Sequence, residues 1–79
     1  MKDKLLEASM KFDFVCLNKL KAKERLGWSG WDDIKNKDIL EERFIKHVKT
    51  PLTQDNLIDI ANFCMFLWNL IETEKEVKK

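Results

Sequence analysis

The sequence predicts an all-α protein of three helices, a leading helix followed by a helical hairpin, which forms a helical bundle by self-association. Apolar residues recur at steps of three and four along most of the chain, which is the period of an α-helix. Two glycines, Gly27 and Gly30, and the single proline, Pro51, divide the chain into three such stretches. No stretch alternates apolar and polar residues over the length of a useful strand.

The first helix is predicted from about Lys4 to Leu26. Its apolar side is formed by five residues at helical spacing: Leu6, Met10, Phe14, Leu17 and Leu20. Gly27 is expected to end the helix, because glycine adopts the left-handed conformation that terminates helices. Cys16 in this segment and Cys64 in the third lie within apolar helical patterns and form no Cys-x-x-Cys pair. We therefore expect two buried free thiols.

The second helix is predicted from about Asp38 to Lys49. Asp38 is expected to cap its first turn, and Glu41 stands three residues later, as in a capping box. The apolar side of this helix has five members: Ile39, Leu40, Phe44, Ile45 and Val48. Thr50 and Pro51 end the helix, because the residue before a proline resists the helical conformation.

The third helix is predicted from about Gln54 to Glu74, with Thr53 as its N-cap and Asp55 placed to complement the helix dipole. It is apolar on almost every side, so protein should surround most of it. Two shorter helices cannot do this alone. We therefore expect a second copy of the chain to cover the rest, in a homodimer or tetramer. The charged tail from about residue 73 is expected to fray.

Length and composition limit the class of protein. The chain has 79 residues, 44% hydrophobic and 37% charged, which predicts one folded domain over residues 1–79. The net charge of +1 gives no overall field that would attract nucleic acid or a membrane. The first residues lack the apolar run of a signal peptide, and no apolar run is long enough to span a bilayer. We therefore expect a cytoplasmic protein.

Four polar residues recur through the apolar third helix. Asp55, Asp59, Asn62 and Asn69 fall within one narrow stripe when placed on a helix. A buried carboxylate is costly unless it is paired or bound to a metal. Asp59, helped by Asp55 or Asn62, would hold Mg²⁺ against a phosphate. Alternatively, Asp59 pairs with a basic side chain on a neighbouring helix and the asparagines set the helix register. The pattern favours the second interpretation.

Three other groups of residues each allow two interpretations. A basic run closes the first helix, where it complements the helix C-terminus or meets phosphates: Lys19, Lys21, Lys23 and Arg25. Trp28 and Trp31 either pack at a core edge or dimer interface, which we favour, or stack on a base. His47 is the single histidine. It is more readily explained as a surface or hydrogen-bonded residue than as a ligand or base.

The order of these segments resembles the MazG-like all-α nucleoside triphosphate pyrophosphohydrolases, especially small phage and bacterial members. The segment DIANFCMFLW, from Asp59 to Trp68, is similar to a D-V-A-N-F-A-M-M motif of their last core helix. The segment KERLGW, from Lys23 to Trp28, resembles a Lys-Gly-Gly-Trp element. The resemblance spans roughly residues 17–70. It implies an obligate helical dimer or tetramer in which Mg²⁺ assists water attack between the α and β phosphates of a nucleotide.

Carried over to this chain, the resemblance leaves the acidic motif incomplete. Asp59 matches the aspartate of the second acidic pair, but Asn56 stands in place of its glutamate partner, with Asp55 beside it. The positions of the first acidic pair fall among basic residues: Lys46, His47 and Lys49. A lysine at such a place repels Mg²⁺, so the residues predict a weak metal cage.

Two functions therefore stay open. In a hydrolase, the catalytic candidates are Asp59 and Glu42, with Glu41 or Glu42 recruited from a shifted register. The candidate Mg²⁺ ligands are Asp59, Asp55 and Glu41. The candidate substrate-binding residues are Lys23, Arg25, Trp28, Trp31, His47 and Asn62. The alternative is a catalytically inactive helical module, for example a phage factor that sequesters a nucleotide signal or inhibits a host protein.

Overall fold

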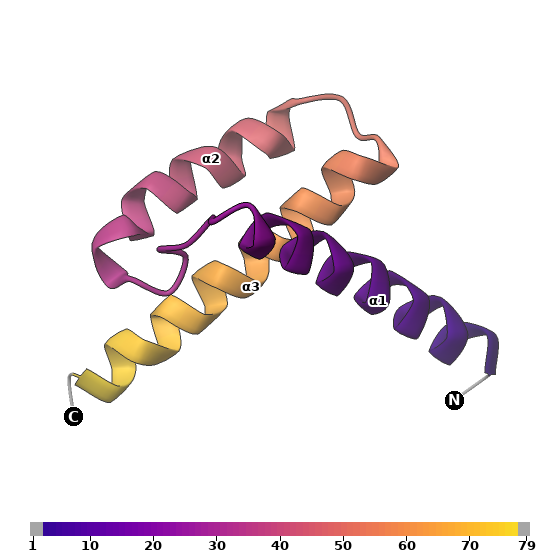
Figure 1. Ribbon diagram of the computed structural model, residues 1–79, viewed down its shortest axis with the longest axis horizontal. Coiled ribbons are helices and arrows are strands. Elements are labelled where there is room, and N and C mark those ends of the chain that lie inside the picture. The colour runs from indigo at the N-terminus through magenta and orange to yellow at the C-terminus, as the bar shows by residue number, and fades with distance from the viewer. Residues whose placement is uncertain (1–2, 78–79) are drawn as a thin grey trace.

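The computed structural model describes residues 3–77, which form three α-helices and one short 3₁₀ helix (Figure 1). Helix α1 spans Asp3–Arg25, η1 spans Ile34–Asn36, α2 spans Lys37–Lys49 and α3 spans Gln54–Val77. No strand occurs among these residues. The predicted all-α fold with three helices is therefore confirmed.

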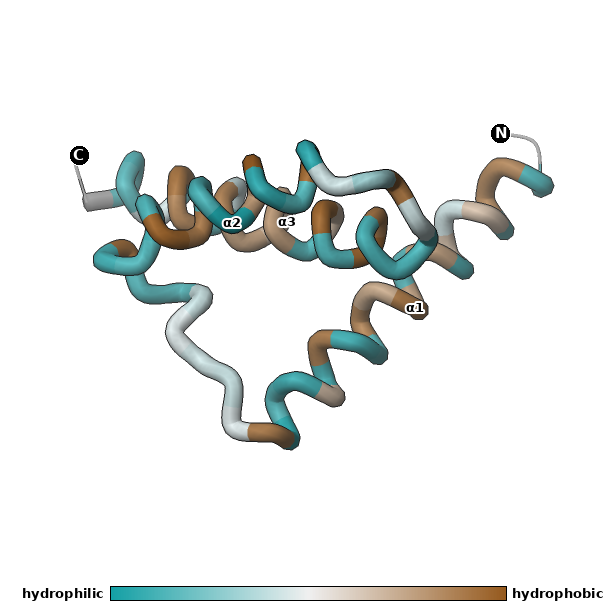
Figure 2. Tube along the Cα trace, turned by 90° about the horizontal axis from the view of Figure 1, so that it is seen from above, coloured by the Kyte–Doolittle hydropathy of each residue, from teal (hydrophilic) through white to brown (hydrophobic). Residues whose placement is uncertain are grey.

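Helices α2 and α3 form a hairpin, and α1 packs against α3 alone (Figure 1). The second half of α1 contacts the first half of α3, where Asn62 donates a hydrogen bond to the carbonyl oxygen of Cys16 over 3.4 Å. The first half of α1 extends beyond the hairpin. Figure 2 shows the segment between α1 and α2 returning from the far end of α1 to the hairpin. The leading helix α1 thus contacts the hairpin through α3.

The core lies between α2, α3 and the loop that follows α1. Its buried cluster consists of Leu40, Phe63, Phe66 and Leu70. Trp28 and Trp31, from the loop, each place their rings 5.3 Å from the ring of Phe66 between centroids. Both indoles are half-buried. The two tryptophans therefore pack at the edge of the core, in agreement with the interpretation that the sequence favoured.

Helix α1 ends in a glycine cap. The N–H of Gly27 bonds the carbonyl of Glu24 and the N–H of Trp28 bonds that of Lys23, the two hydrogen bonds of a Schellman motif. Gly27 has a φ of 87°, which a residue with a Cβ rarely adopts. Gly30 has a φ of 90°, and an added Cβ would lie 2.9 Å from Nδ2 of Asn36. The predicted stop at Gly27 is confirmed.

The start of α2 differs from the prediction. Asp38 is not the N-cap, because α2 begins at Lys37, directly after η1. The capping aspartate is Asp33, which accepts a hydrogen bond from the N–H of Lys35 over 3.0 Å and so begins η1. The side chain of Asn36 donates to the carbonyl of Gly30 over 2.8 Å and ties this turn to the loop.

The start of α3 agrees with the sequence, and its end does not. The hydroxyl of Thr53 accepts a hydrogen bond from the N–H of Asn56 over 3.1 Å, which confirms Thr53 as the N-cap. Thr50 before Pro51 is extended, as expected, with φ −84° and ψ 149°. Helix α3 continues to Val77, so residues 73–77 of the predicted tail are helical. Residues 78–79 of that tail lie outside the described chain.

The two cysteines have different surroundings. Cys16 is a buried free thiol in α1, where burial raises its pKa and the carboxylate of Asp13 raises it further. Cys64 is exposed on α3, so the prediction that both thiols are buried was wrong for this residue. The reason is that neither α1 nor α2 covers this side of α3, where Met65 and Trp68 are exposed as well.

Much apolar surface stays uncovered in the single chain. One side of α1 exposes four residues at steps of three and four: Leu6, Met10, Phe14 and Leu17. Helix α3 exposes four more: Leu57, Met65, Trp68 and Ile71. Figure 2 shows hydrophobic turns along α1 where it runs clear of the hairpin. None of the helices described has the length and apolar character needed to cross a membrane.

Candidate functional site

The first three residues of the polar stripe of α3 contact α1, and lysines of α1 pair with its two carboxylates. The Nζ of Lys19 lies 2.7 Å from Oδ1 of Asp59 and 3.0 Å from Oδ1 of Asp55. The Nζ of Lys23 lies 3.9 Å from the same oxygen of Asp59. The side chain of Asp59 is only 16% exposed, whereas that of Asp55 is 81% exposed. The buried carboxylate of the stripe is therefore ion-paired, as the favoured interpretation of the sequence required.

The pKa of Lys19 reflects this pairing. Burial lowers the pKa of its ammonium, but hydrogen bonds to Asp59 and Asp55 and the charges of both carboxylates raise it by more. The net pKa lies above the ordinary lysine value. Within residues 3–77, no donor other than Lys19 lies within hydrogen-bond distance of Oδ1 of Asp59, which is buried, and Lys23 lies 3.9 Å from it. The charge of Asp59 is thus balanced chiefly by Lys19.

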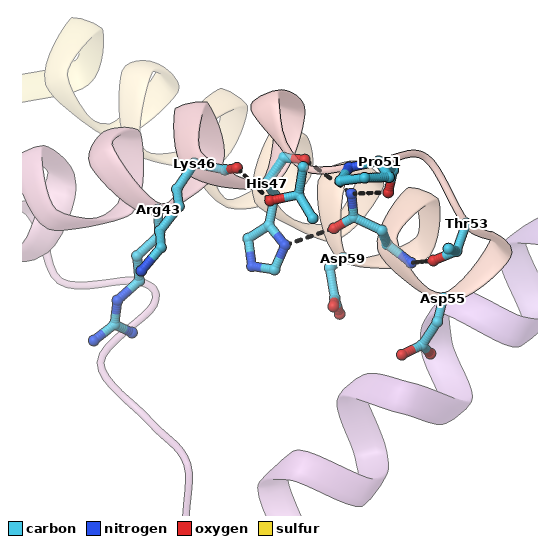
Figure 3. Close-up of a pocket in the computed structure, with 9 residues that line it drawn as sticks. Arg43, Lys46, His47, Pro51, Thr53, Asp55 and Asp59 are labelled. Carbon is cyan, nitrogen blue, oxygen red and sulfur yellow. Dashed lines mark hydrogen bonds between the residues drawn. The ribbon is translucent and has the colours of Figure 1, made fainter.

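A hollow of about 580 Å³ opens beside this ion pair (Figure 3). We call it the α2–α3 hollow, because it lies between the end of α2, the connecting residues 50–53 and the first turns of α3. Its lining is Arg43, Lys46, His47, Thr50, Pro51, Thr53, Asp55, Asn56 and Asp59. Figure 3 shows the side chains of Arg43, His47 and Asp59 extending into the same space. The carboxylate of Asp59 therefore pairs with Lys19 of α1 and also lines this hollow.

His47 and Asn56 join the two helices at the rim of the hollow. Nδ1 of His47 lies 2.7 Å from Oδ1 of Asn56. The amide nitrogen of Asn56 donates to the carbonyl oxygens of His47, over 2.8 Å, and of Pro51, over 3.4 Å. The ring of His47 also lies 5.2 Å from that of Phe63. His47 is thus a hydrogen-bonded residue, as favoured from the sequence, and it faces the hollow as well.

The lining of the hollow contains two cations, Arg43 and Lys46, and two carboxylates, Asp55 and Asp59. Its carboxylates, Asp55 and Asp59, are matched by Lys19 and Lys23 of α1. The side chains of Arg43 and Lys46 are exposed, and in the described part of the chain neither is ion-paired with a carboxylate. Such an arrangement favours an anionic ligand over a cation.

Of the three predicted Mg²⁺ ligands, Asp55 and Asp59 lie together, and Glu41 does not join them in the single chain. Glu41 lies 3.9 Å from Nζ of Lys37, which in turn lies 2.6 Å from Glu74 near the end of α3. From Asp59 to Glu74 the helix rises roughly 22 Å at about 1.5 Å per residue. Among residues 3–77 no group of three His, Cys, Asp or Glu side chains can hold a metal ion. The residues present do not form a Mg²⁺ cage by themselves.

The other predicted site residues lie in different parts of the structure. Glu42 and Arg25 are exposed and do not line the α2–α3 hollow. Lys23 reaches toward Asp59 and also lies 5.4 Å from the ring centroid of Trp28. Asn62 is buried against α1. Trp28 and Trp31 line a second, smaller hollow of about 280 Å³ that shares Arg43 with the first. Of the predicted set, His47, Asp55 and Asp59 thus line the α2–α3 hollow, and Lys23 approaches Asp59 from α1.

Sequence reasoning missed Arg43 and Asn56 as parts of this site. The signal was present for Arg43. Lys46 and His47 follow it by three and four residues, about one turn, so these basic residues share one side of α2. Nothing local indicated that Asn56 would hold His47, since that contact depends on how α2 and α3 meet.

The fold defines a small all-α bundle protein. Comparisons with known protein families, with curated proteins and with solved structures find no match to this chain. The resemblance to MazG-like pyrophosphohydrolases therefore stays a prediction that rests on the motifs quoted above.

Proposed function

We propose that this chain is a helical module that binds a nucleotide through its phosphates in the α2–α3 hollow. The charge balance supports this, because Arg43 and Lys46 face the hollow without a carboxylate partner in the described chain. Guanidinium and ammonium groups are the usual donors to phosphate oxygens. A volume of about 580 Å³ also lies within the usual range for small-molecule sites.

The nucleotide is the part of the proposal that comes from the MazG-like resemblance. Binding without cleavage is favoured over hydrolysis, because Lys19 and Lys23 already occupy the carboxylate of Asp59. A Mg²⁺ ion would have to displace both ammonium groups and then find further oxygen ligands. Sequestration of a nucleotide signal is the activity that this arrangement suits best.

Removing both cations should weaken nucleotide binding. We expect the pair Arg43→Gln and Lys46→Gln to raise the Kd for nucleoside triphosphates by at least about 100-fold, since each hydrogen bond to a charged group contributes about 1.5–3 kcal/mol. Isothermal titration calorimetry with each of the four ribonucleotides and deoxyribonucleotides measures this. The control pair Arg25→Gln and Lys21→Gln removes the same charge from exposed positions of α1 and should leave the Kd unchanged.

Two outcomes would contradict this proposal. Flat titrations of the unaltered protein with every nucleotide would remove the binding function. Release of pyrophosphate in the presence of Mg²⁺, lost in Asp59→Asn, would show a hydrolase and would remove the proposal of binding without cleavage.

We further propose that the module forms a homodimer or tetramer through α1. The uncovered apolar side of α1 supports this, with Met10 62% and Phe14 65% exposed. Only five hydrophobic residues are buried in the described chain, and a domain of this size is marginal with so small a core. A second copy laid against α1 would bury this side and extend the core.

Charge placed on this side of α1 should prevent association. We expect Met10→Glu combined with Phe14→Glu to give a monomer, because association would bury two carboxylates without partners. Size-exclusion chromatography with light scattering measures the mass. The control pair Lys11→Gln and Asn18→Glu changes the net charge equally on the polar side of the same helix and should leave the oligomer intact. A monomeric unaltered protein would exclude this assembly.

A further inference from the structure

The side-chain amide of Asn56 determines which nitrogen of His47 carries a proton. Its Nδ2 faces two carbonyl oxygens, those of His47 and Pro51, and donates to both. The opposite orientation would set Oδ1 against these two acceptors. Oδ1 therefore faces Nδ1 of His47, 2.7 Å away, and can only accept. Nδ1 must be the protonated nitrogen, which leaves a lone pair on Nε2 of the neutral ring.

The lone pair of Nε2 is directed into the α2–α3 hollow. Nδ1 is turned to Asn56, and Figure 3 shows the rest of the His47 ring extending between Arg43 and Asp59. The ring is held from two sides, because Phe63 packs against it and the side-chain amide of Asn56 is fixed by its hydrogen bonds to the carbonyl oxygens of His47 and Pro51. Rotation of the ring would break the hydrogen bond to Asn56. The hollow thus offers one preoriented acceptor beside the cations Arg43 and Lys46.

We infer that His47 makes the hollow selective for a phosphate oxyanion that keeps a proton, against a fully ionised oxyanion of the same size and charge. This rests on the phosphate site proposed above and specifies its ligand. Hydrogen phosphate carries one P–OH group, which donates to Nε2 while its other oxygens accept from Arg43 and Lys46. Sulfate has no proton to give, so one of its oxygens would face the lone pair of Nε2. A positioned acceptor rejects an analogue that lacks the matching donor.

The same chemistry identifies the part of a nucleotide that fits. A terminal phosphate monoester has a titratable oxygen, and in its singly ionised form, which predominates below its second pKa of about 6, it presents a P–OH group to Nε2. A phosphodiester linkage has none. The hollow is therefore a site for the end of a phosphate chain.

Inorganic phosphate and sulfate test this inference directly. Both are titrated into the isotopically labelled protein at about pH 8 and equal ionic strength, where free histidine side chains are neutral and both anions are dianions. The amide NMR signals of Thr53 and Asn56 report binding. We expect phosphate to bind about tenfold more tightly than sulfate. This is the lower end of the affinity ratios expected for the loss of one matched hydrogen bond, because the site is open.

Substitution of His47 gives the matched control. In His47→Gln the new side chain can donate as well as accept, so the ratio of the two affinities should fall to about one. The imidazole nitrogens of the unaltered protein provide a measurement that needs no variant. Their ¹⁵N signals should show Nδ1 protonated and Nε2 bare.

Each remaining outcome overturns the inference. Equal affinity for the two anions would refute the selectivity and leave the phosphate site in place. An unchanged ratio in His47→Gln, or a proton found on Nε2, would remove His47 as its cause. Failure of phosphate to bind would overturn the inference. Flat nucleotide titrations in addition would overturn the proposed function.

Discussion

Replacing Phe66 by alanine is expected to lower the free energy of unfolding by about 3–5 kcal/mol, the usual cost of deleting a buried aromatic side chain. Phe66 is 2% exposed and its ring touches three others. It meets Phe63 edge-on at 5.9 Å, and it supports Trp28 and Trp31 at 5.3 Å each. A small domain has a total stability of only about 5–15 kcal/mol, so this single change should bring the chain close to unfolding.

Urea denaturation followed by circular dichroism measures this loss, and tryptophan fluorescence follows it locally. Both indoles should become more mobile and more exposed at urea concentrations that leave the unaltered protein folded. Phe12→Ala is the matched control, because Phe12 is 43% exposed on α1 and should cost less than about 1 kcal/mol. A loss below about 1 kcal/mol for Phe66→Ala would contradict the position of Phe66 as the centre of the core.

The helices could be predicted from the sequence because their signals are local. The spacing of apolar residues indicated three helices, and Gly27, Thr53 and Pro51 act within one turn of the boundary that each one marks. The start of α2 was missed because Asp33, and not Asp38, makes the capping hydrogen bond. Asp33 caps η1, and the N-cap position of α2 is taken by Asn36, whose side chain donates to the carbonyl of Gly30 instead of capping.

The site was predictable only in part, because its contacts join distant segments. The sequence showed that the carboxylate of Asp59 needs a cation, but the partner, Lys19, is 40 positions earlier on another helix. The exposure of Cys64 likewise depends on which side of α3 the other helices cover. The type of a residue shows that it needs a partner, but which residue becomes that partner depends on how the helices cross.

Replacing Lys19 by methionine is the second change with a large expected effect. It keeps the aliphatic stem and leaves Asp59 without its nearest cation, at 2.7 Å in the native chain. We expect a loss of about 1–3 kcal/mol at neutral pH, below the value for a fully buried pair because both side chains are partly exposed. Lys21→Met, on an exposed position of the same helix, should change stability by less than about 0.5 kcal/mol.

The pH dependence of this loss identifies its electrostatic origin. Because the pKa of Lys19 is raised in the folded chain, its stabilising contribution is complete below the ordinary lysine pKa of about 10.4. The contribution disappears as the pH rises through the raised pKa. Stability of the unaltered protein should therefore fall more steeply above about pH 10 than that of Lys19→Met.

Urea titrations at neutral and at strongly alkaline pH should accordingly show the stabilities of the unaltered protein and Lys19→Met converging as the pH rises.

Adding Asp59→Leu to Lys19→Met removes both charges. At neutral pH the double variant should therefore regain most of the lost stability, because it has no unpaired buried carboxylate. If Lys19→Met were as stable as the unaltered protein at neutral pH, the carboxylate of Asp59 would be free of α1 and available to the hollow. Asp59 would then be able to bind a cation, which its ion pair with Lys19 now prevents.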